Sequence, residues 1–336
     1  MDIETPDLVA DRSVRKLPRH PLRIPGMPTT AIRGSTRALL AVVALALIGC
    51  APGNEVAREL RIACDDGSPK ACADYAAKLQ KGEYTLQDLP RAAVLYDTAC
   101  VGGVGQGCTS LGSMLLTGKR AGVKADSTRA AKLLTRGCEL RSMEGCARLG
   151  TLYQAGVVVP KDPARASSLY KEACDGADMF GCAQLGLLYS DSSAADRDFT
   201  RAAALLQKSC DAKVAVGCVG LGRLRAAGAG IAKNDSIAVA LFRQSCRSRD
   251  HVGCYDLAMT YETGRGVPQS FERAADLYQQ GCDEGNAAAC ARLASMFERG
   301  AGMYRNPKRA KEFREKACRA GDKSSCEQPK PAGATI

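Results

Sequence analysis

The chain has 336 residues, of which 46% are hydrophobic and 25% are charged, and this composition excludes a protein that is disordered throughout. It contains 17 Cys but only two His and no Trp, which excludes a multi-His metal site or a relay of several His. The net charge of +11 comes from interspersed Lys, Arg, Asp and Glu, without a basic block joined to aromatic residues, so we expect no nucleic-acid partner.

An unbroken apolar run, Ala38 to Ile48, follows Arg33 and Arg37 near the N-terminus. Such a run is too short to span a bilayer, and basic residues before it are typical of a secretory signal. It leads into Leu47-Ile48-Gly49-Cys50, which resembles the lipobox of bacterial lipoproteins. The resemblance implies cleavage before Cys50 and lipidation of that residue, with the lipid as the only attachment to a membrane. An uncleaved anchor helix is the alternative.

The signal, Cys50 and the folded part of the chain together predict five segments. Met27 gives the signal an ordinary length, so we interpret it as the natural start. The segments are a non-native or disordered extension (1–26), the lipoprotein signal peptide (27–49), a short linker (50–59), a folded repeat region (60–326) and a disordered tail (327–336).

The other 16 Cys form a regular series of Cys-x7-Cys pairs. Each pair recurs after 36 residues, apart from one step of 38 between Cys100 and Cys138. The pairs are Cys64/Cys72, Cys100/Cys108, Cys138/Cys146, Cys174/Cys182, Cys210/Cys218, Cys246/Cys254, Cys282/Cys290 and Cys318/Cys326. A fixed period of this length is typical of a solenoid of helix hairpins.

The first half of each unit has the pattern of a helix, which we name helix A. Counted from the second Cys of a pair, position +3 is Leu in six units, +4 is always Gly or Ala, and +7 is usually aromatic or Leu. These positions form one apolar face at helical spacing. Gly follows at +10 in six of seven units, where a left-handed C-cap is easiest without a Cβ.

A second helix, helix B, is predicted to begin after an N-cap residue at +16, allowing for the two-residue insertion in unit two. Those residues are Asp88, Asp126, Asp162, Asp198, Asn234, Ser270 and Asn306. All are good N-caps, and Ala stands four residues after each. Leu or Phe at +23, usually an aromatic residue or Leu at +24, and the Cys at +28 complete an apolar stripe. The sequence therefore predicts an all-α protein of seven antiparallel helix hairpins.

In this hairpin geometry the two Cys of each pair face each other across a short turn between helix B and the next helix A. A small residue directly before each second Cys, such as Gly181, leaves room for a Cα separation within bonding range. Local pairing is the arrangement that treats every repeat identically, so we predict eight local disulfides and no free thiol among these Cys. The alternative, zinc bound by paired thiolates, normally uses Cys-x2–4-Cys spacing.

The repeat unit also resembles a known family. Cys-Ala-x-Leu-Gly-x-x-Tyr-x-x-Gly, as in Cys146 to Gly156, is followed by Asp-Pro-x-Arg-Ala-x-x-Leu-Tyr-x-x-Ala-Cys, as in Asp162 to Cys174. This unit resembles the Sel1-like repeat family, and its Cys-x7-Cys form is similar to the cysteine-rich, Hcp-like bacterial proteins often labelled beta-lactamases. The resemblance implies a tetratricopeptide-like right-handed superhelix with one disulfide per repeat. It also implies an interaction scaffold, with weak binding or hydrolysis of penicillin-type compounds as an alternative.

Residues for catalysis are scarce. Ser168-Leu-Tyr-Lys171 has the spacing of a serine beta-lactamase nucleophile and its Lys, but other units hold unrelated residues in the same slots, and no Lys-Thr-Gly follows. His251 lies in a turn between repeats, where the other units have different residues. We predict no catalytic residue, no cofactor and no metal. Redox protection is a third class, disfavoured because no Cys-x-x-Cys is present.

The positions opposite the apolar face of helix A, at +2, +5 and +9, are the candidate binding groove. They vary between units, as solvated positions also do. We select Arg148, Gln184, Arg223, Asp256 and Arg292. The three Arg would offer donors to a carboxylate-bearing protein, peptide or cell-wall fragment. We thus expect a monomeric scaffold, exported to the bacterial envelope or beyond it, that binds a protein or peptide, or else a peptidoglycan fragment or beta-lactam.

Overall fold

A computed structural model describes residues 52–191 and 197–326, and within these ranges the regular structure is entirely helical. The predicted signal, Cys50 and the tail lie outside these residues. None of the described helices is both long enough and apolar enough to cross a bilayer. The first helix, α2 (Pro52–Asp65), begins inside the segment 50–59 that was expected to be a linker.

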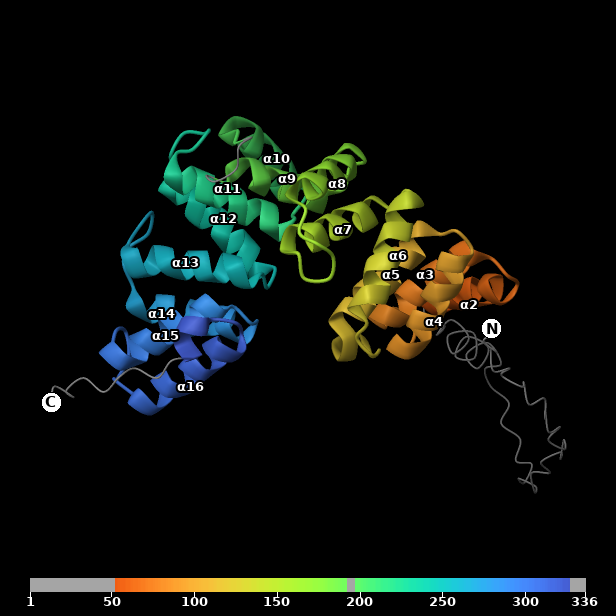
Figure 1. Cartoon of the computed structure of the whole chain (residues 1–336). Helices are drawn as coiled ribbons and strands as arrows, with labels where there is room; N and C mark the ends of the chain where they lie inside the picture. The colour runs from red at the N-terminus through yellow and green to blue at the C-terminus, as the bar shows by residue number, and fades with distance from the viewer. Residues whose placement is uncertain (1–51, 192–196, 327–336) are drawn as a thin grey trace, which may run out of the picture. The chain divides into compact units, whose positions relative to one another are not determined.

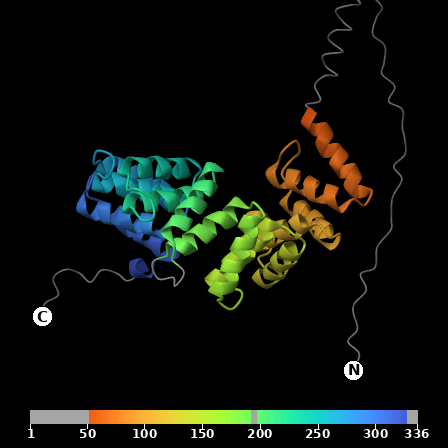
Figure 2. The same cartoon turned by 90° about the horizontal axis from the view of Figure 1, so that it is seen from above.

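Seven hairpins, units one to seven, follow α2 in chain order, each with one A helix and one B helix, and the predicted period is confirmed (Figures 1 and 2). The A helices are α3 (Pro69–Lys81), α5 (Gly105–Thr117), α7 (Met143–Ala155), α9 (Met179–Ser190), α11 (Ala215–Ala227), α13 (His251–Thr263) and α15 (Ala287–Arg299). The B helices are α4 (Leu89–Val101), α6 (Ser127–Glu139), α8 (Pro163–Asp175), α10 (Phe199–Asp211), α12 (Asp235–Arg247), α14 (Phe271–Asp283) and α16 (Pro307–Arg319). Two short 3-10 helices, η1 (Gly118–Ala121) and η2 (Lys323–Cys326), complete the described structure.

Both ends of the hairpins follow from local chemistry. All seven predicted N-caps of the B helices accept a hydrogen bond from a backbone N–H of the first turn. Each such cap is worth about 1 kcal/mol, and together they define where helix B begins. In unit four, which lacks the Gly, α9 ends at Ser190 and its C-cap Asp191 is extended, whereas five of the other A helices end on a left-handed Gly.

The core lies between the helices of each hairpin and between successive hairpins. The Ala four residues after each N-cap is at most 1% exposed in all seven units, which lets the two backbones approach closely. The apolar face of helix A is wider than positions +3, +4 and +7, because position +6 is buried as well, as at Met114, Leu224 and Met296. The repeat pattern does not reveal the burial of +6, because Lys78 and Thr260 occupy this position in other units.

Eight disulfides join the two Cys of each pair, with Cα separations of 4.4–4.8 Å, as the period predicts. Each bond ties the end of one unit to the start of the next. The turn inside it needs a left-handed residue five positions before the second Cys. Four of these turns use Gly, while the four central ones use Arg141, Ala177, Lys213 and Arg249 at φ between 59° and 65°.

The two Cys of a pair differ in their surroundings, although the sequence pattern treats them alike. The second Cys lies in the first turn of helix A, where it packs into the core between two units. In the first seven pairs this residue is at most 1% exposed: Cys72, Cys108, Cys146, Cys182, Cys218, Cys254 and Cys290. The eighth, Cys326, is exposed because it lies on η2 and no further hairpin covers it. The second Cys therefore belongs to the core as well as to the crosslink.

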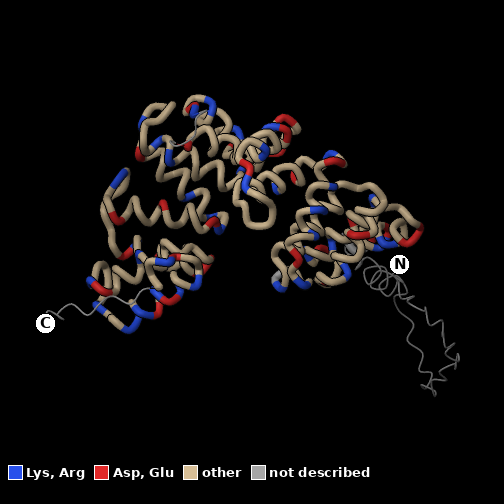
Figure 3. The backbone as a smooth tube through the Cα atoms, in the orientation of Figure 1, with Lys and Arg blue, Asp and Glu red and all other residues tan. Residues whose placement is uncertain are grey.

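The hairpins place the A helices in one layer and the B helices in another. From α5 to α13, each A helix packs against the A helix of the next unit, whereas contact between neighbouring B helices is slight or absent in the described residues. From α5 to α13 the A layer is therefore a continuous surface to which successive units each contribute one helix. Charged residues of both signs lie along the whole array (Figure 3).

Candidate functional site

The five predicted groove residues lie on five successive A helices, α7 to α15, but their exposure to solvent differs. Arg148 and Gln184 are half-buried, and Arg223 and Arg292 are exposed. Asp256, expected on the solvated stripe, is only 8% exposed. It is buried because α11 packs against α13 and covers position +2 of that helix.

Among these five residues, the structure brings Arg223 and Asp256 together. The Arg223 guanidinium donates from Nε to Oδ2 of Asp256 at 2.7 Å and from Nη2 to Oδ1 at 3.3 Å. This bidentate pair joins units five and six. Burial raises the pKa of Asp256, and the Arg223 guanidinium opposes this rise. The pair is thus part of the contact between repeats.

The other two Arg also have carboxylate partners within the chain. Arg148 lies 2.7 Å from Oε1 of Glu144, which in turn accepts a hydrogen bond from Gln106 on α5. Arg292 lies 3.9 Å from Oε1 of Glu262. Each of the three predicted Arg is therefore close to a carboxylate of this chain, and only the rest of its guanidinium donors can serve a ligand.

A second polar pair recurs inside the hairpins, between position +8 of helix A and position +24 of helix B. The Tyr96 hydroxyl donates to Gln80 at 2.9 Å, and the Tyr170 hydroxyl donates to Gln154 at 2.7 Å. The same contact joins Tyr278 to Glu262 at 2.6 Å in unit six. Burial, together with the neighbouring carboxylate, raises the pKa of Tyr278.

Unit five lacks this polar pair. It has Ala226 at +8 and Phe242 at +24, so both the amide and the hydroxyl are replaced by apolar groups. The ring of Phe242 is 4% exposed and lies against Gly222, where an added Cβ would come within 2.5 Å of a ring carbon. The small side chain of Ala226 leaves the space above this ring unfilled.

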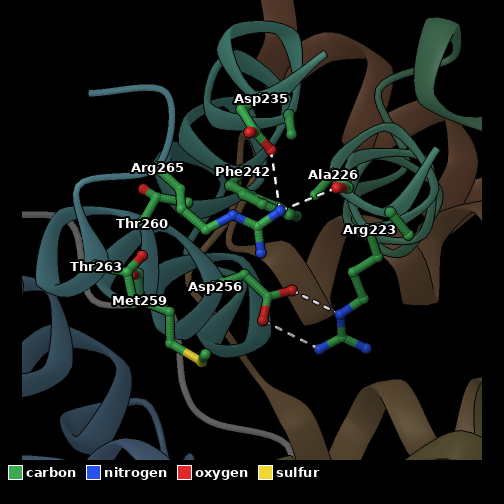
Figure 4. Close-up of a pocket in the computed structure, with 11 residues that line it drawn as sticks. Arg223, Ala226, Asp235, Phe242, Asp256, Met259, Thr260, Thr263 and Arg265 are labelled. Carbon is green, nitrogen blue, oxygen red and sulfur yellow. Dashed lines mark hydrogen bonds and ion pairs between the residues drawn. The ribbon is translucent and has the colours of Figure 1, made fainter. Parts of the chain in front are cut away.

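A pocket of about 300 Å³ occupies this position, between α11, α12 and α13 (Figure 4). Its floor is mainly apolar and includes Ala226, Ala238, Phe242 and Met259. The Arg223–Asp256 pair forms one side of it. This volume is at the lower end of the range for ligand sites, so it suits a small group or one side chain.

Arg265 forms the opposite side of the pocket. It comes from the loop after α13, and its Nη2 donates to the Ala226 carbonyl at 2.9 Å and to Oδ1 of Asp235 at 3.1 Å. One side chain of unit six thus reaches the end of α11 and the start of α12 in unit five (Figure 4). Sequence reasoning missed Arg265, Asp235 and Ala226. The signal was the combination at +8 and +24 of unit five, where the small Ala226 accompanies the aromatic Phe242.

The residues with catalytic spacing do not form a catalytic arrangement. Ser168 and Lys171 line a shallow recess on α8, where Nζ of Lys171 lies 4.0 Å from Asp175. In the two described ranges of the chain, no hydrogen bond joins Ser168 to Lys171. Cys138 and Cys146 lie near Glu172, but their sulfurs are joined in a disulfide and offer no thiolates to a metal.

The paired Cys were candidate residues in the sequence, and the structure gives them a role in the fold rather than in a surface site. The buried second Cys of the first seven pairs cannot present a sulfur to a ligand on the A helices. These residues, Cys72, Cys108, Cys146, Cys182, Cys218, Cys254 and Cys290, are closed in disulfides and covered by neighbouring helices. As predicted, these residues form disulfides, and the bonds hold successive units together.

Comparison with known proteins agrees with this description. The model of the Sel1 repeat matches seven times, at residues 69–102, 105–142, 144–178, 180–214, 215–250, 251–286 and 287–322. No curated protein matches the chain.

Among solved structures, a protective antigen of uropathogenic Escherichia coli with an SLR fold is 25% identical, with a TM-score of 0.52. The match covers 80% of this chain but only 57% of the antigen, little more than half its length. A Sel1 repeat protein from Oxalobacter formigenes is 20% identical over 80% of this chain and 78% of its own, with a TM-score of 0.54. Cysteine rich protein B of Helicobacter pylori is 25% identical over 40% of this chain and 98% of its own, with a TM-score of 0.33. Seven matched repeats over most of the described residues show that this chain belongs to the Sel1 repeat family.

Proposed function

We propose that this Sel1 repeat protein is an exported scaffold that binds a protein or peptide partner along its A helices. The observation that carries the proposal is the continuous A layer. Its core positions repeat from unit to unit, whereas the side chains at +2, +5 and +9 differ and are mostly half-buried or exposed. A surface of this kind can recognise an extended partner, with each unit contributing different contacts.

Two sets of substitutions test this proposal. The first places Ala at Arg148, Gln184 and Arg292, which all lie on A helices. The second, a matched control, places Ala at Arg129, Arg201 and Gln207, which are exposed on B helices. A peptide selected on the oxidised protein from a displayed library should bind the first variant at least tenfold more weakly and the control variant unchanged. Equal binding to both variants would contradict the proposal.

The cellular location is supported by the disulfides. Eight disulfides indicate an oxidising environment outside the cytoplasm. We propose that lipid on Cys50 anchors the chain to the bacterial envelope. Replacing Cys50 with Ser should then release soluble protein and abolish labelling with a radioactive fatty acid, because a lipid anchor requires the sulfur. Membrane association retained by this variant would instead favour an uncleaved anchor at residues 38–48.

Hydrolysis or binding of beta-lactams is the alternative function, and it rests on family resemblance alone. Turnover of nitrocefin by the purified, oxidised protein distinguishes the two functions, since a scaffold has none above the rate of a heat-denatured control. A soluble peptidoglycan fragment, tested in the same peptide-binding assay, decides whether a cell-wall ligand competes for the A helices.

A further inference from the structure

We infer that the pocket in unit five binds one apolar side chain that is followed directly by a carboxylate group. This inference rests on the proposed function, because it names the part of a peptide partner that this unit recognises. It depends on the replaced polar pair, on the apolar floor to which that replacement contributes, and on the unused donors on the two sides.

The way in which the polar pair is replaced distinguishes this pocket, because units two and four also lack the pair but have Leu116 with Leu134 and Ser190 with Leu206, whereas unit five combines the small Ala226 with a phenyl ring. In units one, three and six, a Gln or Glu at +8 accepts a hydrogen bond from the Tyr at +24. In unit five both partners are replaced together, by Ala226 and Phe242. The joint replacement avoids an unsatisfied polar group, which alone would cost about 1–3 kcal/mol, and leaves apolar surface open to a ligand.

The floor selects for an apolar group. Ala238 and Phe242 are nearly fully buried, and the half-buried Met259 also lines the pocket (Figure 4). A Met side chain adapts its shape to different apolar partners. The volume of about 300 Å³ admits a single aliphatic or aromatic side chain rather than a larger ligand.

The two sides select for a carboxylate beside that group. Arg223 and Arg265 each use part of their guanidinium to hold an Asp, and within the described residues the Nη1 of each donates no hydrogen bond. Nζ of Lys233 lies 3.8 Å from Asp235. The pocket lining thus holds two cations, Arg223 and Arg265, and two carboxylates, Asp235 and Asp256, and the unused guanidinium donors on its two sides can bind a further carboxylate.

The pocket can be filled without disturbing the fold, because units one and three already contain larger side chains at the same two positions. The double variant Ala226→Gln with Phe242→Tyr reproduces the Gln–Tyr pair of units one and three. The control variant Leu116→Gln places the same amide at +8 of unit two, far along the chain from the pocket. Both variants should keep all eight disulfides and unfold within a few degrees of the parent protein.

The probe is N-acetyl-L-leucine, which joins an isobutyl side chain to a carboxylate, and its carboxamide removes the charge alone. Binding is followed through the ¹³C-methyl resonance of Met259, assigned with the variant Met259→Leu. We expect a saturable shift with the acid, about fivefold weaker binding of the carboxamide, and at least tenfold weaker binding of the acid to the filled pocket. The control variant should bind the acid as the parent protein does.

Several outcomes would overturn the inference. These are the absence of a saturable shift in the parent protein, unchanged binding to the filled variant, or equal affinity for the acid and the carboxamide. If the library-selected peptide still binds the filled variant while the probe does not bind the parent, then the pocket assignment fails and the A-helix proposal stands. If the probe does not bind the parent and the peptide binds the A-helix and B-helix variants equally, both fail.

Discussion

Removal of one internal disulfide should loosen the two units that it joins. The bond between Cys174 and Cys182 closes a loop of nine residues between α8 and α9. On the chain-entropy model such a loop stabilises the folded state by about 2.6 kcal/mol. Cys174 is 6% exposed and Cys182 0%, so replacing both with Ala also removes buried sulfur contacts, which adds on the order of 1 kcal/mol.

Native-state hydrogen exchange measures this effect where it occurs. The free energy of opening of amides in α8 and α9 should fall by about 3–4 kcal/mol in the Cys174→Ala, Cys182→Ala variant, while amides in the distant helix α3 should change less. The matched control removes the bond between Cys318 and Cys326, which has the same sequence separation of 8 but lies at the end of the array, with Cys326 exposed on η2. It should affect mainly α16. Unchanged exchange in α8 and α9, or an equal loss from the terminal variant, would refute the reasoning.

Three further predictions concern stability. In units three, six and seven an Arg at +19 lies over an aromatic ring at +7. Unit five instead has Arg225 at +7 and Ile237 at +19. Within the described residues, Nε of Arg225 is buried and has no hydrogen-bond partner. The double variant Arg225→Tyr, Ile237→Arg should therefore stabilise the protein by about 0.5–1 kcal/mol in thermal unfolding, and a lower midpoint would contradict this. Lys213 has φ of 63° where the terminal units have Gly, so Lys213→Gly should raise stability by up to about 1 kcal/mol, and urea unfolding that shows a loss would argue against strain there. Burial raises the pKa of Asp256, so its carboxyl group stays protonated to higher pH in the folded state than in the unfolded chain. Ionisation of this group as the pH rises above the ordinary pKa of 3.8 therefore lowers the stability of the folded state. The variant Asp256→Asn should thus lose less stability than the parent between pH 4 and 7, and parallel curves would contradict the assignment.

The fold could be predicted because its determinants are local. The N-cap at Asp162, the Pro after it and the Leu at +3 each act within one helix turn. An N-cap residue recurs in all seven units, and Leu at +3 recurs in six of them. The disulfides followed as well, because the two Cys of a pair are separated by one turn of chain. The near-complete burial of the second Cys did not follow, since it depends on the packing of the neighbouring helices. The width of the apolar face was underestimated where a polar side chain such as Thr260 replaces the usual apolar residue at +6.

The candidate site could be predicted only in part. The position of Arg223 on the A-helix surface followed from helical spacing, but its pairing with Asp256 depends on how α11 packs against α13, across 33 residues of sequence. Arg265 also acts across a long separation, since it reaches Ala226 across 39 residues and Asp235 across 30, both in the preceding unit. Repeat alignment was able to reveal the coupled change of Ala226 and Phe242, but not the pocket that results from it.

The central claim is that a partner binds along the A helices. Hydrogen exchange of the oxidised protein, with and without the library-selected peptide, tests this most directly because it reports on every helix in one measurement. The account predicts added protection in α7, α9, α11 and α13, with little change in α6, α8, α10 and α12. Protection confined to the B helices or to the turns between repeats would contradict it.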